Sequence, residues 1–323
     1  MSLDAAGLVA LADLKSIALR TALTGTSALL DIFVLCPGIH RQQSAPELNN
    51  GEYPACGAMT TGYVFRVENP ATVLFLQKVG VSGQLTTISV KSAQVTKSKW
   101  SQRMSRIFTF QNASLKSSCA YLLAVLMTMI ALTLLIISRD WWGLTVILFL
   151  CTSRLFNTLI IQNRTNVKWH GASEPGVKGD LIILLSQDRW IRMQGFVDDL
   201  KAVTSGEWLR EMTFVESSFA AFATLLVYLD AALASNVKQA GKIILLVLLF
   251  ASAGVLAIAN ETTESLQMHG RIVKVQGPRK RYARRLEMVE QLIEESGRDD
   301  WALRMGMKVK KEDRETEQEG VIM

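Results

Sequence analysis

The stretch that decides the fold is CAYLLAVLMTMIALTLLIIS, residues Cys119–Ser138, which contains no charged side chain. An α-helix of about 20 apolar residues, rising about 1.5 Å per residue, crosses a hydrocarbon core about 30 Å thick. Three further apolar runs of similar length are Trp142–Ile161, Phe214–Ala234 and Lys242–Ala259. We therefore predict an integral membrane protein with four transmembrane helices.

The spacing of these runs predicts two helical hairpins, since only a few residues separate the runs within each pair. The 323 residues are 49% hydrophobic, which is close to the value for a soluble protein, so the clustering rather than the composition indicates the class. The predicted fold class is an α-helical membrane protein, with two transmembrane hairpins and a composite cytosolic α+β domain.

Basic residues gather on one side of the predicted bundle, and the positive-inside rule assigns that side to the cytosol. They are Lys91, Lys97, Lys99, Arg103, Arg106 and Lys116 before the first run, Arg164, Lys168, Lys178, Arg189, Arg192, Lys201 and Arg210 in the middle loop, and Arg271, Lys274, Arg279, Lys280, Arg281, Arg284 and Arg285 after the fourth. We expect both termini in the cytosol, and the sequons at Asn112, Asn163 and Asn260 unglycosylated.

Short segments rich in β-branched and aromatic residues occur in all three cytosolic pieces, and their punctuation by Gly, Pro and Asn is typical of strands. They are Tyr63–Val67, Thr72–Gln77, Leu85–Val90, Asp180–Leu185, Trp190–Phe196 and Arg271–Gln276. Because unpaired strand edges are unfavourable, we predict a single sheet built from all three pieces.

Helical and loop patterns account for the remaining segments. Ala22–Cys36 is apolar but short, which favours a buried or interfacial helix over a re-entrant or additional span. Residues 40–58 are typical of a loop. Asp198 and Asp199 are candidate caps for a helix running to Ser205.

Residues 279–296 have the pattern of an amphipathic helix, and 308–323 form a charged tail that we expect to be disordered. The predicted division of the chain is 1–58 N-terminal helical and loop region, 59–118 cytosolic β-rich segment, 119–161 first hairpin, 162–213 cytosolic loop with strands and a helix, 214–259 second hairpin, 260–307 cytosolic strand and helix, and 308–323 tail.

Four polar residues inside the apolar runs are the candidate functional residues: Arg154, Asn157, Glu216 and Asp230. Charges in hydrocarbon are unfavourable and face other helices or a wet cavity. Helix geometry puts Arg154 and Glu216 about 6–7 Å apart in depth, so we predict an ion pair between them and water contact for Asp230 near the outer end. We favour a structural role, with an ion or substrate pathway as the alternative.

A basic cluster after the last run is expected to contact anionic lipid headgroups at the cytosolic face rather than nucleic acid. It consists of Arg279, Lys280, Arg281, Arg284 and Arg285. Small residues on the third and fourth runs permit close packing within the chain or a homo-oligomer.

Three residues, Cys36, His40 and Cys56, lack the paired spacing of a zinc site, so we predict neither a metal nor another cofactor. No catalytic motif occurs in the sequence. The remaining candidates for an active site are His170, Asp198 and Asp199, which are isolated from nucleophile partners.

Two stretches, Trp169–Val203 and the segment around Gly297–Trp301, resemble uncharacterised fungal multi-pass integral membrane proteins. That resemblance provides no catalytic residues that could be transferred to this sequence. We expect a non-enzymatic membrane protein whose cytosolic domain is a scaffold or recruits partners. The alternatives are a small transporter or channel subunit, and an accessory protein or enzyme that handles a lipophilic, specialised-metabolite substrate.

Overall fold

A computed structural model describes residues 9–92, 115–165 and 171–309 of the chain. It divides into two compact units, each assembled from three separate pieces of sequence. We call them the membrane unit, which comprises Met1–Asn50, Ala93–Lys168 and Trp208–Gly270, and the sheet unit, which comprises Gly51–Ser92, Trp169–Glu207 and Arg271–Met323.

The membrane unit contains four helices long and apolar enough to cross a membrane, as predicted. They are α4 (Leu115–Ile137), α5 (Trp141–Arg164), α7 (Phe214–Leu233) and α8 (Gln239–Glu261). Side chains define two of their starts. Asp140 accepts a hydrogen bond from the Gly143 amide at the start of α5, and Thr213 with Glu216 forms a capping box at the start of α7.

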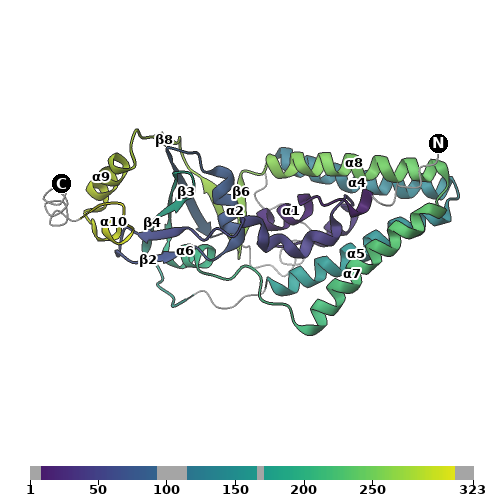
Figure 1. Cartoon of the computed structure of the whole chain (residues 1–323), viewed down its shortest axis with the longest axis horizontal. Helices are drawn as coiled ribbons and strands as arrows, with labels where there is room; N and C mark the ends of the chain where they lie inside the picture. Colours follow the sequence, from purple (N-terminus) through teal and green to yellow (C-terminus); the bar gives the residue numbers. More distant parts are fainter. Residues whose placement is uncertain (1–8, 93–114, 166–170, 310–323) are drawn as a thin grey trace, which may run out of the picture. The chain divides into compact units, whose positions relative to one another are not determined.

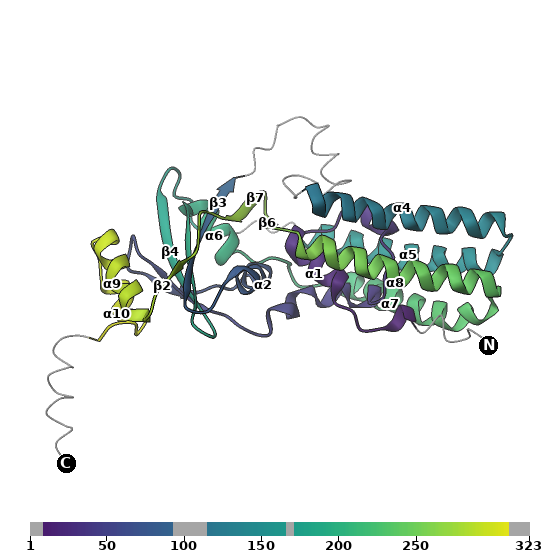
Figure 2. The same cartoon turned by 90° about the horizontal axis from the view of Figure 1, so that it is seen from above.

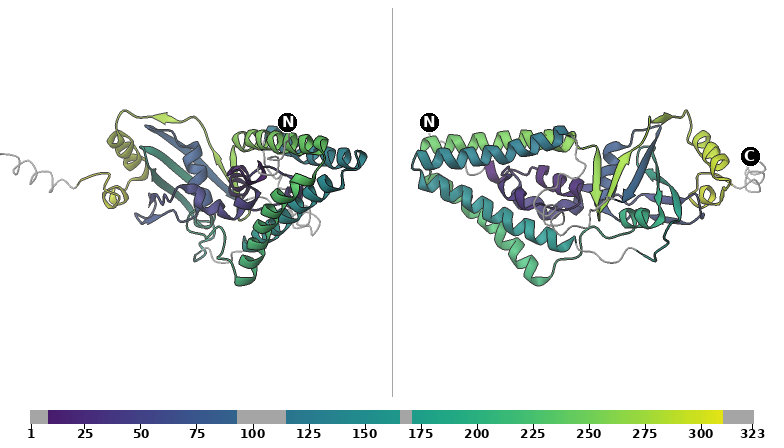
Figure 3. Two further views of the ribbon diagram at one scale, coloured as in Figure 1. Left: turned by 45° about the vertical axis from the view of Figure 1, so that its right-hand side comes forward. Right: turned by 180° about the vertical axis from the view of Figure 1, so that it is seen from behind.

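Packing in the membrane unit differs from a pair of sequential hairpins. Helix α4 packs along α8, and α5 packs along α7. The two pairs lie close together at the end with the interhelical turns and separate toward the other end (Figures 1 and 3). Helices adjacent in sequence are therefore not the main packing partners in this unit.

The N-terminal segment lies between the two helix pairs (Figure 1). It contains α1 (Ser16–Thr24) and two 3₁₀-helices, η2 (Leu29–Phe33) and η3 (Ile39–Asn49). Val34, Leu35 and Ile39 belong to the same buried cluster as side chains of the four long helices. Ala22–Cys36 is therefore buried but is not one continuous helix. The prediction of a loop over residues 40–58 was wrong, because η3 and strand β1 occupy much of that range.

The sheet unit confirms a single sheet built from all three predicted pieces (Figure 2). Six strands lie in the order β2-β1-β4-β5-β3-β7, and β8 pairs with β3. All of these neighbours are antiparallel except β3 and β5. The strands are β1 (Ala55–Ala58), β2 (Val64–Arg66), β3 (Gln84–Ser92), β4 (Lys178–Leu185), β5 (Arg189–Phe196), β7 (Arg271–Val275) and β8 (Lys280–Arg281); β6 (Ser265–Met268) precedes β7 in the chain.

Two local predictions in the sheet unit were wrong. Thr72–Gln77 is not a strand but part of helix α2 (Pro70–Val79), which starts where Asn69 accepts the Thr72 amide and Pro70 occupies the first turn. Helix α6 (Val197–Thr204) has Phe196 at its N-cap position, so Asp198 and Asp199 lie in its first turn and do not cap it.

Helices cover both sides of the sheet, with α9 and α10 on one side and α2 on the other (Figures 1 and 2). Helix α9 (Arg285–Ser296) is shorter than the predicted 279–296, because Lys280–Arg281 pairs with β3 as strand β8. A buried cluster joins α9 and α10 (Asp300–Arg304) to the sheet; it includes Leu85, Ile182, Trp190, Met288, Val289, Leu292 and Trp301.

Candidate functional site

Arg154 is buried in the membrane unit, but it does not pair with Glu216. Its Nε donates a hydrogen bond to the Asp31 carbonyl oxygen at 3.1 Å, and its Nη1 donates to the Gln42 side chain. Both acceptors belong to the N-terminal segment. The predicted ion pair was wrong because depth along two helices does not reveal a third segment lying between the helix pairs.

Asp31 is the second centre of this buried network. Its carboxylate accepts the Ala28 amide at 2.9 Å and the Tyr121 hydroxyl of α4. The Arg20 guanidinium lies 5.3 Å from the centre of the Tyr121 ring. These contacts join the N-terminal segment to α4, while Arg154 joins it to α5. The one sequence signal of this buried polar site is that Asp31 is a carboxylate within the otherwise apolar stretch Ala22–Cys36.

Arg20 extends the network to both members of the α4/α8 pair. Its Nη1 donates to Ser117 Oγ and to Thr263 Oγ1, both at 3.1 Å. Ser117 lies in α4, and Thr263 follows the end of α8. Asn157 acts in a similar way on α5, since its Oδ1 accepts the Gln43 side-chain amide at 3.0 Å. The long helices therefore bind the N-terminal segment through hydrogen bonds as well as through apolar packing.

Glu216 is satisfied locally at the start of α7. Its carboxylate receives two bonds from Arg210, at 2.5 and 2.8 Å, one from Asn163 at 2.6 Å, and one from the Thr213 amide at 3.0 Å. A carboxylate in the first turn of a helix also interacts favourably with the helix dipole. Glu216 therefore caps the start of α7 and forms an ion pair there with Arg210.

Asp230 is 1% exposed, so the expected contact with water at the outer end is wrong in this structure. Its Oδ1 atom has no hydrogen-bond partner within the described ranges. A carboxyl group of this kind, lying within a membrane-spanning helix, is costly to bury and is the clearest candidate for an interaction with a small cation or proton.

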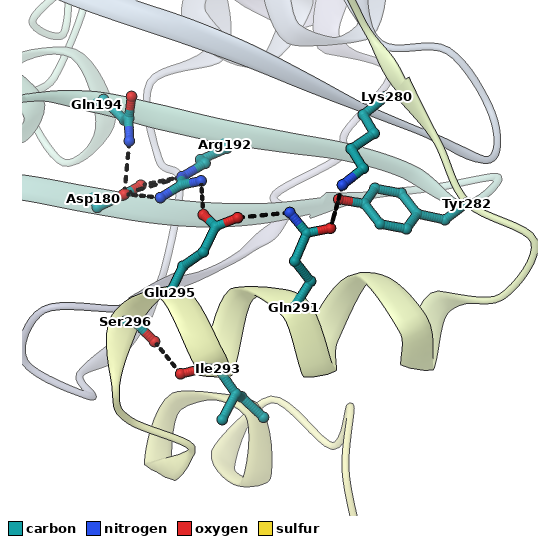
Figure 4. Close-up of polar contacts among 9 residues, drawn as sticks. All are labelled: Asp180, Arg192, Gln194, Lys280, Tyr282, Gln291, Ile293, Glu295 and Ser296. Carbon is teal, nitrogen blue, oxygen red and sulfur yellow. Dashed lines mark hydrogen bonds and ion pairs between the residues drawn. The ribbon is translucent and has the colours of Figure 1, made fainter.

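The sheet unit contains a second polar network, which links β4 and β5 to α9 (Figure 4). Arg192 bonds Asp180 through Nη2 at 2.7 Å and Glu295 through Nη1 at 2.5 Å. Gln291 donates to the other Glu295 oxygen at 2.6 Å and accepts from Lys280 at 2.5 Å. The Asp180 hydrogen bond to Arg192 raises the pKa of the guanidinium further above its ordinary value, so this link stays charged.

A row of polar side chains runs across four strands on the same face as Arg192. The register pairs Asp180 with Gln194, Gln194 with Ser89, and Ser89 with Lys274. Lys274 is exposed, and the other three are half-buried. We call these four residues the polar row; together they offer a carboxylate, an amide, a hydroxyl and an ammonium group.

Members of the predicted basic cluster make contacts inside the sheet unit. Arg279 donates to the Val79 carbonyl at 3.2 Å, Lys280 bonds Gln291, and Arg285 pairs with Asp188. The exposed Arg281 and Arg284 complete the cluster. Its predicted contact with lipid headgroups stays a prediction.

The residues considered for metal binding or catalysis do not converge. Within residues 9–92, 115–165 and 171–309, no group of three His, Cys, Asp or Glu side chains is placed to hold a metal ion. Burial raises the pKa of the Cys56 thiol. Asp199 forms an ion pair with Arg271 at 2.9 Å, whereas Asp198 accepts bonds from Ser173 and the Glu174 amide. His170 lies outside the described residues.

Comparison of the chain with protein-family models, curated proteins and solved structures found no match.

Proposed function

We propose that this protein is a non-enzymatic, multi-pass membrane protein whose sheet unit recruits a protein partner at the cytosolic face. The observation that carries the proposal is the polar row, because it lies on the sheet face that also bonds α9 and combines hydrogen-bond donors, acceptors and both signs of charge. Polar, partly exposed surfaces of this kind suit reversible protein contacts. The basic flanks of the spans support a cytosolic orientation for both termini and the sheet unit.

The intramembrane charges support an anchoring role for the membrane unit. Arg154, Asp31 and Glu216 all bond to groups of the same chain. A transport path needs polar groups that exchange partners with the solute, whereas groups bonded to their own chain stabilise helix packing. The exposed Arg281 and Arg284 provide charge for anionic headgroups.

Site-specific photo-crosslinking tests recruitment. The full-length protein is expressed with p-benzoylphenylalanine at Ser89, in the polar row, or at the exposed Glu290 of α9 as the matched control, and native membranes are irradiated. We expect a discrete, protease-sensitive adduct from position 89 and none from position 290. The proposal fails if position 89 yields no adduct, or if both positions yield the same adducts.

A transporter or channel subunit is the second candidate, and Asp230 is the observation that favours it, since its buried Oδ1 has no partner within the described ranges. Purified protein in liposomes containing a pH-sensitive dye tests this function. Proton flux that is abolished by Asp230→Asn, with unchanged thermal stability, would favour transport. Equal dye responses in protein-containing and empty liposomes would exclude proton transport.

A further inference from the structure

Contacts of η3 fix how deep the N-terminal segment reaches along the long helices. The side chain of Gln42 accepts from Arg154, and that of Gln43 donates to Asn157 at 3.0 Å. At about 1.5 Å per residue, Asn157 and Arg154 lie about 10 and 15 Å along α5 from its end at Arg164. This part of η3 is therefore between about one-third and one-half of the way across a hydrocarbon core about 30 Å thick.

A contact on α7, the packing partner of α5, supports a similar depth. The His40 ring lies 6.2 Å from the Tyr228 ring of α7. Tyr228 is about 21 Å along the helix from Phe214 and about 8 Å from Leu233. Contacts with both helices of the α5/α7 pair thus place the beginning of η3 within the span, rather than at the basic end of the bundle.

An exposed ion pair lies on this same turn. Arg41, which stands between His40 and Gln42, donates from Nε and Nη2 to the two carboxylate oxygens of Asp13 at 3.0 and 3.1 Å. The Arg41 and Asp13 side chains are 47% and 56% exposed. By contrast, Arg154 at a similar depth is 1% exposed.

Acyl chains cannot solvate such a pair. Charged groups that face hydrocarbon are strongly disfavoured, and membrane proteins place them against protein, water or headgroups. The pair offers a planar guanidinium, which binds phosphate oxygens, beside a carboxylate, which accepts from an ammonium group. Lys15, two residues after Asp13, is also exposed and adds positive charge.

We propose that Asp13 and Arg41 bind the headgroup of a zwitterionic phospholipid that enters the membrane unit from the side. The lipid phosphate contacts Arg41 and the headgroup amine contacts Asp13. The bond between Arg41 and Asp13 is therefore exchanged for one bond from each side chain to the oppositely charged group of the lipid headgroup. The site makes the N-terminal segment a lipid-binding element of the membrane unit, a role separate from recruitment by the sheet unit.

Native mass spectrometry of the full-length protein tests the proposal. The probes are phosphatidylethanolamine and diacylglycerol with identical acyl chains, titrated in detergent. We expect the phospholipid to bind at least about 10-fold more tightly than diacylglycerol, and Arg41→Gln to remove that preference, because a charge-assisted bond to phosphate is worth about a factor of 10 or more. Arg66→Gln, at an exposed arginine of β2, is the matched control and should keep the preference.

Two further variants separate binding from folding. Arg41→Lys keeps the cation and should retain phospholipid binding, even if Arg41→Gln lowers stability. Asp13→Asn should lower the affinity for phosphatidylethanolamine more than that for phosphatidic acid, which has no amine. Equal binding of phospholipid and diacylglycerol to the unaltered protein, as a merely water-filled crevice would give, overturns the proposal. So does Arg41→Gln protein that keeps both its melting temperature and its phospholipid preference.

Discussion

Replacing Gly25 with alanine tests the close contact that positions the N-terminal segment. Gly25 has φ of 71°, and a Cβ atom added there would lie 2.0 Å from the Gln267 carbonyl oxygen and 3.3 Å from Met268 Cα, both backbone atoms. The Gly25 carbonyl also accepts the Trp208 indole N–H at 2.8 Å. Gly270, in the same unit, has the same φ of 71° but nothing within 4 Å of its added Cβ, so Gly270→Ala is the matched control.

The magnitude follows from two separate costs. A left-handed conformation costs an alanine about 1–2 kcal/mol, and the lower entropy of its unfolded chain returns about 0.4–1 kcal/mol. Gly270→Ala should therefore destabilise by about 1 kcal/mol. Gly25→Ala adds an overpacking cost of about 1–3 kcal/mol, because backbone must move to relieve the contact. At roughly 2–3 °C per kcal/mol, the expected losses in melting temperature are about 2–3 °C for the control and about 5–10 °C for Gly25→Ala.

Heating the full-length protein in detergent, followed by size-exclusion chromatography with tryptophan fluorescence, measures both shifts. The ratio between the two variants is the decisive quantity, since the φ cost is common to both. Equal shifts would show that the Gln267 backbone is not where the structure puts it. A larger loss for Gly270→Ala would contradict the steric argument altogether.

Three other outcomes are expected. N-ethylmaleimide should label Cys56 only after unfolding, as followed by mass spectrometry, because Cys56 is fully buried and its thiol pKa is raised. In denaturant titrations, Trp301→Ala should destabilise the sheet unit by about 3–5 kcal/mol, because Trp301 is fully buried. The control Tyr63→Ala, at an exposed side chain, should cost less than about 1 kcal/mol, and similar losses for the two variants would exclude Trp301 from the core. Burial raises the pKa of Glu52, but hydrogen bonds from Gln77 and Ser186 outweigh burial and lower it overall, so its stabilisation is present above its ordinary value of 4.5 and lost as the pH falls below it. Melting curves of Glu52→Gln should therefore converge with those of the unaltered protein at acid pH, and a constant gap would contradict this assignment.

Local patterns predicted most of the elements and fewer of the contacts. The four spans and the strand segments were predictable because apolar runs and β-branched alternation are properties of neighbouring residues. Thr72–Gln77 was wrongly predicted as a strand because its β-branched and aromatic residues occur in both strands and buried helices. The helix begins there because Asn69 caps it and Pro70 occupies its first turn. The partner of Arg154 was not predictable, since Gln42 is more than a hundred residues away and lies in a segment expected to be a loop.

The sequence by itself predicted four helices long and apolar enough to cross a membrane, and strands from three separated pieces that share a sheet. Both predictions rest on local sequence and on general costs, namely the thickness of hydrocarbon and the cost of unpaired strand edges, and not on detailed packing. Only the tertiary structure decided that α4 packs with α8 and α5 with α7, and that the N-terminal segment lies between these pairs with an exposed Asp13–Arg41 ion pair. Side-chain shape and hydrogen-bond geometry across distant segments select such contacts, and neither is encoded in hydropathy or charge counts.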